Sequence, residues 1–127
     1  MNILLVDDSI GDALIASLVI KRKKPAEVDV DITEASSLHD AASALTKSSF
    51  DCILLDLHLP DGRGYSNIDK LKTVAPQTPI IVMTGSDSGG SENEALKHGA
   101  SAYISKKPLS QSDDIYAAVT LAIDKGV

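Results

Sequence analysis

The chain of 127 residues contains little of several residue types on which particular protein classes depend. Its single cysteine, Cys52, excludes an intramolecular disulfide, so a secreted disulfide-rich scaffold is not expected. The longest apolar stretch, Ala13 to Ile20, is short and is interrupted by Ser17, which predicts no membrane span. The N-terminus also lacks a basic segment followed by an apolar one, which an export signal requires. We therefore expect a cytoplasmic protein with no membrane partner.

Basic residues are also scarce. Lysine and arginine number 12 against 18 aspartate and glutamate residues, which gives a formal net charge of −6. A nucleic-acid backbone requires a basic surface, so no direct nucleic-acid partner is expected. The one basic run, Lys21-Arg22-Lys23-Lys24, precedes Pro25 and is typical of the last turn of a helix, where cations complement the helix dipole.

What the sequence does contain is a regular alternation of apolar runs and amphipathic stretches. With 43% hydrophobic and 24% charged residues, residues 1–127 have the composition of one globular domain. Each apolar run of four or five residues predicts a buried strand, and each stretch with apolar residues three or four apart predicts a helix. The expected strands are Ile3–Val6, Val28–Thr33, Cys52–Leu55, Pro79–Met83 and Ala102–Ile104. The first helix is expected from about Ile10 to Lys24, and the fourth is expected between a capping box of Ser91 and Glu94 and a stop at Gly99. The apolar residues that indicate the other three helices are Leu38, Ala41, Ala42 and Leu45 for the second, Ile68, Leu71 and Ala75 for the third, and Ile115, Ala118, Val119 and Ala122 for the fifth.

Five strands alternating with five helices predict a parallel sheet, because each return to the sheet is a right-handed crossover through a helix. The strand at Val28–Thr33 alternates valine and isoleucine with aspartate, which is typical of an edge strand. The apolar strands then occupy the middle. We therefore expect an α/β, flavodoxin-like (βα)5 three-layer sandwich with strand order 2-1-3-4-5. In such a sheet, ligands bind beyond the carboxyl ends of the strands.

Acidic residues stand at two of these strand ends. Asp7 and Asp8 follow the first strand, and Asp56 follows the third, so the predicted strand order brings three carboxylates to one place. Carboxylates that lie close together resist joint ionisation unless a cation lies among them, and oxygen ligands suit Mg²⁺. An alternative is that Asp7 or Asp8 caps the following helix, with Ser9 as a competing cap.

A hydroxyl and an ammonium group follow the last two strands. Thr84 ends the fourth strand and Lys106 follows the fifth, at the same edge of the sheet as Asp56. A metal, a lysine and positioned donors around a carboxylate are the groups that phosphoryl transfer needs, with Asp56 as the nucleophile. Taken singly, Thr84 is equally an ordinary strand residue and Lys106 an ordinary surface lysine.

The sequence resembles the response-regulator receiver domains of two-component signalling, which are similar to chemotaxis regulators, and the resemblance covers essentially the whole chain. The residues that carry it are the Asp7-Asp8 pair, Asp56 within Leu54-Leu55-Asp56-Leu57-His58-Leu59-Pro60-Asp61-Gly62, Thr84, Gly99-Ala100, Tyr103 and Lys106.

This resemblance implies a function and a ligand set. Asp8, Asp56 and the backbone carbonyl of His58 would bind Mg²⁺ directly, and Asp7 would act through a water. A histidine kinase or a histidine phosphotransfer protein would donate the phosphoryl group to Asp56. The chain would catalyse only its own phosphorylation and dephosphorylation, and would not be a dedicated enzyme.

The resemblance also implies how a signal leaves the domain. After phosphorylation Thr84 would move onto the phosphoryl group and Tyr103 would turn inward. These changes would remodel the face formed by the fourth helix, fifth strand and fifth helix, which would bind an output protein. The chain would be a receiver without an output domain, either complete or part of a longer protein.

Two departures from the family pattern produce further expectations. Lys107 occupies the place where receivers carry proline, and Pro108 follows it, so we expect either a strained cis peptide or a rerouted loop there. Gly89-Gly90 should loosen the start of the fourth helix and raise mobility over residues 86–92. His39 and His98 are expected to be solvated, and we hypothesise that the His58 side chain influences the lifetime of the aspartyl phosphate.

Two other functions compete with this interpretation. One is a small aspartate-nucleophile phosphohydrolase, but such enzymes carry Asp-x-Asp after the first strand, whereas here the motif follows the third strand and has His58 in its last position. The other is a pseudo-receiver that docks without phosphorylation, which the complete acidic set makes the least favoured of the three.

Overall fold

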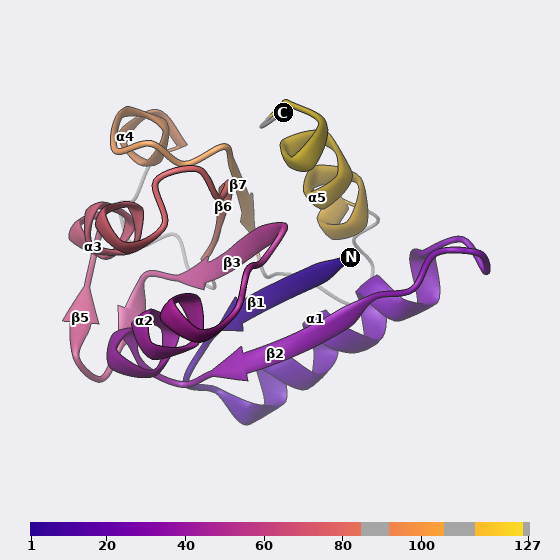
Figure 1. The fold of residues 1–127 in the computed structure, drawn as a ribbon. Coiled ribbons are helices and arrows are strands. Elements are labelled where there is room, and N and C mark those ends of the chain that lie inside the picture. Colours follow the sequence, from indigo (N-terminus) through magenta and orange to yellow (C-terminus); the bar gives the residue numbers. More distant parts are fainter. Residues whose placement is uncertain (85–91, 106–113, 126–127) are drawn as a thin grey trace.

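A parallel sheet of five strands forms the centre of the structure (Figure 1). The computed structural model describes residues 1–84, 92–105 and 114–125. The strands, in the order in which they lie side by side, are Asp31–Ala35 (β2), Asn2–Val6 (β1), Cys52–Asp56 (β3), Ile80–Thr84 (β6) and Ala102–Ser105 (β7). Every neighbouring pair is parallel. Counted along the chain, this is the predicted order 2-1-3-4-5, so the predicted fold class is confirmed.

Helices cover both faces of the sheet, as Figure 1 shows. Residues of α1 and α5 belong to one core cluster, and residues of α2, α3 and α4 belong to the other. The helices are Ile10–Lys23 (α1), Leu38–Lys47 (α2), Ser66–Val74 (α3), Glu92–Lys97 (α4) and Asp114–Lys125 (α5). The sheet is therefore the middle layer of three, and its carboxyl-terminal edge is the place at which loops can carry chemistry.

The two core clusters explain why the central strands are apolar without interruption. Successive residues of a strand point to opposite faces. In β1, Ile3 and Leu5 pack on the side of α1 and α5, while Leu4 and Val6 pack on the side of α2 and α3. All four side chains are fully buried. A strand that is covered on both faces has no position that tolerates a polar residue, so the first polar residue marks the end of the strand.

The strand β2 is an edge strand, as predicted, but it runs from Asp31 to Ala35 and not from 28 to 33. The Val28 N–H donates to the Pro25 carbonyl, which makes residues 25–28 a turn. Regular pairing starts where Asp31 lies opposite Asn2 at the beginning of β1. The neighbouring strand therefore sets the bounds of β2, and its own alternating pattern does not.

The loop after β3 contains a small hairpin that the sequence pattern did not predict. His58–Leu59 (β4) and Gly62–Arg63 (β5) pair antiparallel, with Pro60 and Asp61 between them. Leu59 is almost completely buried, which anchors the hairpin to the core on the α2 and α3 side. Strands of two residues are too short to show an apolar periodicity, so the pattern predicted only a loop.

The end of α4 confirms the predicted stop at Gly99. The Ala100 N–H donates to the Ala95 carbonyl, and the Gly99 N–H donates to the Leu96 carbonyl. This pair of bonds is a Schellman motif, which places its central residue in the left-handed region. Gly99 has φ of 106°, a value that glycine adopts without steric cost.

Several expectations fall outside the described part of the chain. They concern the capping role of Ser91, the mobility of residues 86–91 and the backbone at Lys106-Lys107-Pro108. Among the residues that are described, no helix combines the length and the apolar character needed to cross a bilayer.

Substituting Gly99 tests the Schellman motif. A methyl group there would meet only the flexible Lys72 side chain at ordinary contact distance, so the cost of Gly99→Ala is that of the positive φ. We expect the free energy of unfolding in urea to fall by about 1 kcal/mol.

Gly11, on α1, is the matched control because a methyl group there meets nothing within 4 Å. Gly11→Ala should raise the free energy of unfolding by about 0.5 kcal/mol, since alanine is the better helix former. Equal effects from the two substitutions would contradict the proposed origin of the cost.

Candidate functional site

Three aspartates meet at the carboxyl-terminal edge of the sheet. One carboxylate oxygen each from Asp7, Asp8 and Asp56 can be chosen so that all three lie within 4.8 Å of one another. Asp7 and Asp56 are each only 6% exposed, whereas Asp8 is exposed. The structure thus brings together the three carboxylates that the strand order predicted.

The register of the central strands produces this cluster. β1 and β3 pair so that Val6 lies opposite Leu55, which puts the following residues, Asp7 and Asp56, at the same level of the sheet. The Asp7 backbone N–H donates to the Ala35 carbonyl at the end of β2, which fixes the exit of the chain from β1. The positions of the buried pair of acids therefore follow from backbone pairing.

Each buried carboxylate is also held by the backbone two residues further on. Asp7 Oδ1 accepts a hydrogen bond from the Ser9 N–H at 2.9 Å. Asp56 Oδ1 accepts one from the His58 N–H at 3.0 Å. Both are Asx turns, in which a carboxylate oxygen accepts a hydrogen bond from the backbone two residues further along the chain.

Ser9, and neither Asp7 nor Asp8, is the N-cap of α1. Its Oγ accepts a hydrogen bond from the Asp12 N–H at 3.2 Å, in the first turn of the helix. The alternative interpretation of the acidic pair as a helix cap is therefore wrong. Because Ser9 fills that role, the two aspartates are available for another.

The chemistry of this group fits a hard divalent cation. All the donors are oxygen atoms, and three negative charges at this separation, two of them buried, repel one another strongly unless a cation lies among them. Because Asp8 is exposed, one side of the cluster opens to water, which suits an ion that keeps part of its hydration shell.

The other predicted site residues are described to different extents. His58 begins β4, with its side chain exposed and its backbone beside Asp56. Tyr103 lies in β7, where it is half-buried against the core cluster on the α4 side. Thr84 ends β6 at the same edge of the sheet as Asp56. The Thr84 side chain, and Lys106 entirely, lie outside the described residues.

Asp61 anchors the hairpin beside the site, a role the sequence did not reveal. Its two carboxylate oxygens accept hydrogen bonds from the backbone N–H groups of Leu38, at 2.8 Å, and His39, at 2.9 Å. These groups are in the first turn of α2, whose N-cap is Ser37. The hydrogen bonds from Leu38 and then His39 lower the pKa of the Asp61 carboxyl.

His98 is partly exposed, in line with the prediction of a solvated histidine, but it also makes contacts that the sequence did not predict. Its Nδ1 lies 2.9 Å from Asp69 Oδ2, and its ring stacks on Tyr65 with 5.6 Å between ring centroids. These contacts join the C-terminal end of α4 to α3. His39, in contrast, is exposed, as predicted.

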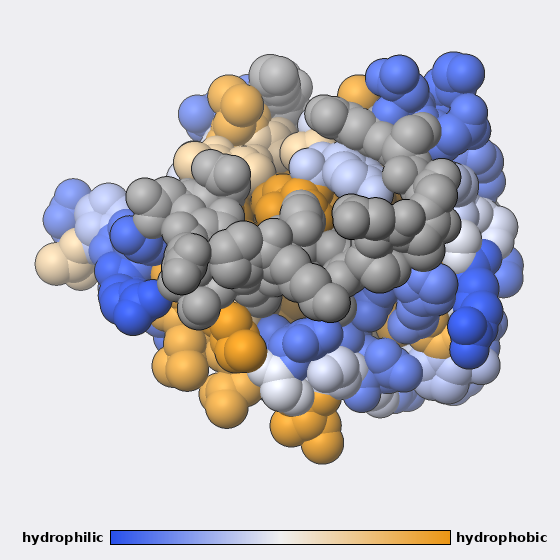
Figure 2. All heavy atoms as spheres, turned by 180° about the vertical axis from the view of Figure 1, so that it is seen from behind, coloured by the Kyte–Doolittle hydropathy of each residue, from blue (hydrophilic) through white to orange (hydrophobic). Residues whose placement is uncertain are grey.

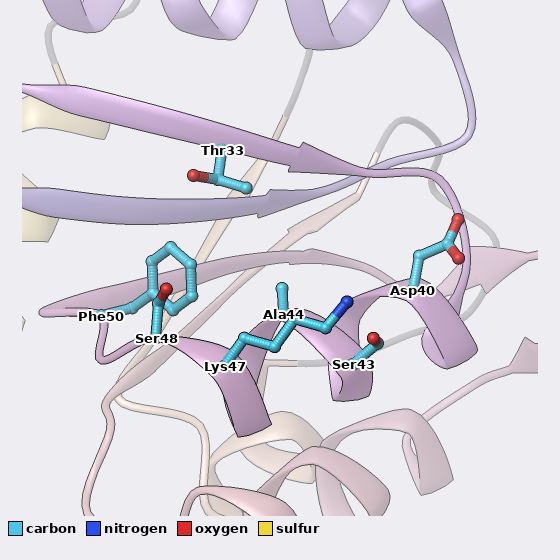
Figure 3. A pocket seen from close by; sticks show the side chains of 7 residues that line it. All are labelled: Thr33, Asp40, Ser43, Ala44, Lys47, Ser48 and Phe50. Carbon is cyan, nitrogen blue, oxygen red and sulfur yellow. The ribbon is translucent and has the colours of Figure 1, made fainter.

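A surface hollow lies between α2 and β2 (Figure 3). It shares no residue with the acidic cluster, and its side chains contain no second carboxylate beside Asp40. Seven residues line it: Thr33, Asp40, Ser43, Ala44, Lys47, Ser48 and Phe50. The chemistry therefore points to the acidic cluster and not to this hollow.

A family model and several known proteins match this chain. The family model described as "Response regulator receiver domain" matches residues 3–120. The regulatory protein LuxO of Vibrio cholerae is 31% identical over 121 residues, which cover 95% of this chain and 25% of LuxO. The swarming motility regulation protein RssB of Serratia marcescens is 32% identical over 108 residues, 84% of this chain and 46% of RssB. The chain thus spans less than half the length of these relatives.

Solved structures give the same result. A Burkholderia pseudomallei response regulator with a phosphorylated aspartic acid, calcium ion and citrate is 26% identical, with a TM-score of 0.75. The likeness covers 98% of this chain and 69% of that one. A Clostridium thermocellum receiver domain protein has a TM-score of 0.80 at 23% identity, which shows the shared fold.

The Asp61 anchor should make stability depend on pH. Because the folded pKa lies below the ordinary value of 3.8, the carboxylate stabilises the fold above that value, and its contribution disappears as the pH falls through the folded pKa. Asp61→Asn should therefore lower the melting temperature at pH 7, and the difference from the wild type should shrink toward pH 2.5. Glu27→Gln, an exposed carboxylate after α1, is the control and should show no such trend.

Proposed function

The chain belongs to the family of response regulator receiver domains, and from that premise we propose that Asp56 accepts a phosphoryl group from a phosphohistidine. The donor would be a histidine kinase or a histidine phosphotransfer protein. The observation that carries the proposal is the meeting of Asp56 with Asp7 and Asp8 at one edge of the sheet. The cytoplasmic location and the extent of the domain over residues 1–127 stay predictions.

In the proposed reaction an Asp56 carboxylate oxygen attacks the phosphorus of the phosphohistidine. The new P–O bond forms as the P–N bond breaks, and the electron pair of that bond stays on the imidazole nitrogen of the donor. The His58 N–H, bonded to Asp56 Oδ1 at 3.0 Å, orients the carboxylate for attack. The product is an aspartyl phosphate.

The acidic cluster would hold Mg²⁺, which supplies positive charge against the oxygens of the phosphoryl group when it is bound. Asp8, Asp56 and the His58 carbonyl would be direct ligands, and Asp7 would act through a water. The phosphorylated Burkholderia relative contains a calcium ion, a hard cation that also takes oxygen ligands. Lys106 and Thr84 would contact the phosphoryl oxygens from the other side.

The signal would leave through α4, β7 and α5. In the proposal Thr84 moves toward the phosphoryl group, and Tyr103 turns further inward and changes the surface that an output protein binds. Tyr103 is half-buried beside α4, so a change of its rotamer would alter the packing of α4 on β7. The aspartyl phosphate is then a charge that shifts a two-state surface.

Phosphorylation by a small donor tests the chemistry directly. Intact-mass spectrometry after incubation with acetyl phosphate and Mg²⁺ should show one added phosphoryl group on the wild type and none on Asp56→Asn. A chelator should abolish the addition. Asp29→Asn is the control, because Asp29 is an exposed residue that precedes β2, at the opposite edge of the sheet.

Addition to Asp56→Asn, or no addition to the wild type, would contradict the proposal. Release of many phosphates per protein molecule from a generic phosphate ester would favour the phosphohydrolase instead.

The donor protein must cover the acidic cluster, and α1 offers the adjoining apolar surface. Ile10, Leu14 and Leu18 lie on one face of α1 and are 86%, 56% and 57% exposed. Figure 2 shows hydrophobic side chains gathered along this edge of the molecule. Ile10 is separated from Asp8 only by Ser9, so the surface begins beside the site. We propose that the phosphohistidine protein docks on this α1 face.

A charged substitution on α1 should distinguish docking of the donor protein from the phosphoryl-transfer reaction itself. Leu14→Asp should slow phosphoryl transfer from a phosphohistidine protein by about tenfold, because it places a charge in an apolar interface. The rate with acetyl phosphate should not change. Leu96→Asp, at an exposed leucine of α4 on the opposite face, is the control. Equal slowing with both donors would show that the substitution disturbs the site and not docking.

A further inference from the structure

We propose that Asn67 of α3 is a positioning residue for the metal site, and that it acts through the peptide group between Leu57 and His58. This inference rests on the proposed function, because it concerns how Asp56 and the His58 carbonyl are held ready for Mg²⁺. Asn67 does not itself reach the metal in this proposal.

Asn67 is a fully buried polar residue whose two amide hydrogens are both used. Nδ2 donates to the Leu57 carbonyl at 3.1 Å and to the Gly62 carbonyl at 3.1 Å. Its Oδ1, in contrast, is buried and has no hydrogen-bond partner among the described residues. A flipped amide would set Oδ1 against two carbonyl oxygens, so the two donated bonds fix the orientation of the side chain.

Apolar packing does not explain asparagine at this position. The neighbouring Ile68 and Leu71 on the same helix are core residues, and a leucine has the same branched shape as asparagine but no oxygen that needs a partner. What asparagine supplies, and an apolar residue does not, is the pair of hydrogen bonds to the loop. The unpartnered Oδ1 lies beside the α-carbon of Gly62. A β-carbon on that residue would overlap both Asn67 and Leu38.

The hydrogen bonds of Asn67 reach the site through a single peptide group. The carbonyl of Leu57 and the N–H of His58 belong to the same rigid plane. Asn67 and the Gly64 N–H hold the oxygen end of this plane, at 3.1 and 2.8 Å. The other end donates to Asp56 Oδ1 at 3.0 Å. Fixing the oxygen end therefore fixes the donor that orients the nucleophilic carboxylate.

The same plane also sets the direction of the proposed backbone ligand. The His58 carbonyl follows it directly in the chain, and the second hydrogen bond from Asn67, to Gly62, holds the opposite strand of the hairpin. Without Asn67 the carbonyl and the carboxylate would each sample more orientations. Groups that orient metal ligands in this way change metal affinity even though they never touch the ion.

Asn67→Leu removes both donated bonds and keeps the branched shape of the side chain. We expect the dissociation constant for Mg²⁺, measured by titration with NMR detection, to rise about tenfold. The His58 amide should exchange faster with solvent in the absence of metal. Phosphorylation by acetyl phosphate should need more Mg²⁺ for half-maximal rate, while the rate at saturating Mg²⁺ stays close to that of the wild type.

The control is Ile68→Val, a conservative change at the next residue that lowers stability without removing a hydrogen bond to the loop. Its Mg²⁺ affinity should equal that of the wild type. If Asn67→Leu does not fold, Asn67→Ala takes its place, because the smaller side chain removes the same bonds without any overlap.

Unchanged Mg²⁺ affinity and unchanged His58 exchange in the Asn67 variants would overturn the positioning role and leave the proposed function intact. A wild type that binds no Mg²⁺ and accepts no phosphoryl group would overturn both.

Discussion

The adjacency of β1 and β3 is the constraint on which the rest of the site depends. Pairing Val6 with Leu55 leaves Asp7 and Asp56 at the same level, so folding itself forces negative charges together. That arrangement opposes folding, because charges of one sign that lie close together and out of water destabilise the compact state. The apolar strands on both sides provide the burial that offsets it, since their side chains are fully enclosed.

Hydrogen bonds to main-chain groups hold the described part of the site. Asp7 is joined to Ser9 and to the end of β2, and Asp56 is joined to His58. The hairpin that starts at His58 is in turn tied to α2 through Asp61 and to α3 through Asn67. Each of these links uses a main-chain group, whose position the sheet and the helices fix.

The sequence predicted those features that local patterns determine. Apolar runs located the central strands, the polar alternation identified the edge strand, and Gly99 marked the end of α4. The predicted bounds of β2 were wrong, because the neighbouring strand sets them. The contacts of His98 were not predicted, because they are made with a helix that is distant in the sequence. The anchoring role of Asp61 was not predicted, because its hydrogen-bond partners lie 22 and 23 residues away in the sequence, beyond any local periodicity.

The phosphate-accepting site and the residues proposed to transmit the signal also differ in how firmly their surroundings hold them. Asx turns hold the carboxylates of Asp7 and Asp56, and hydrogen bonds from Asn67 and Gly64 hold the Leu57–His58 peptide, before any phosphoryl group arrives. Preorganised donors act best when they do not move during the reaction. A structural response to phosphorylation must then arise where packing permits two arrangements. In the proposed function that place is Tyr103, whose half-buried ring packs against the core cluster on the α4 side. The proposed switch thus combines a preorganised acceptor with a surface that repacks.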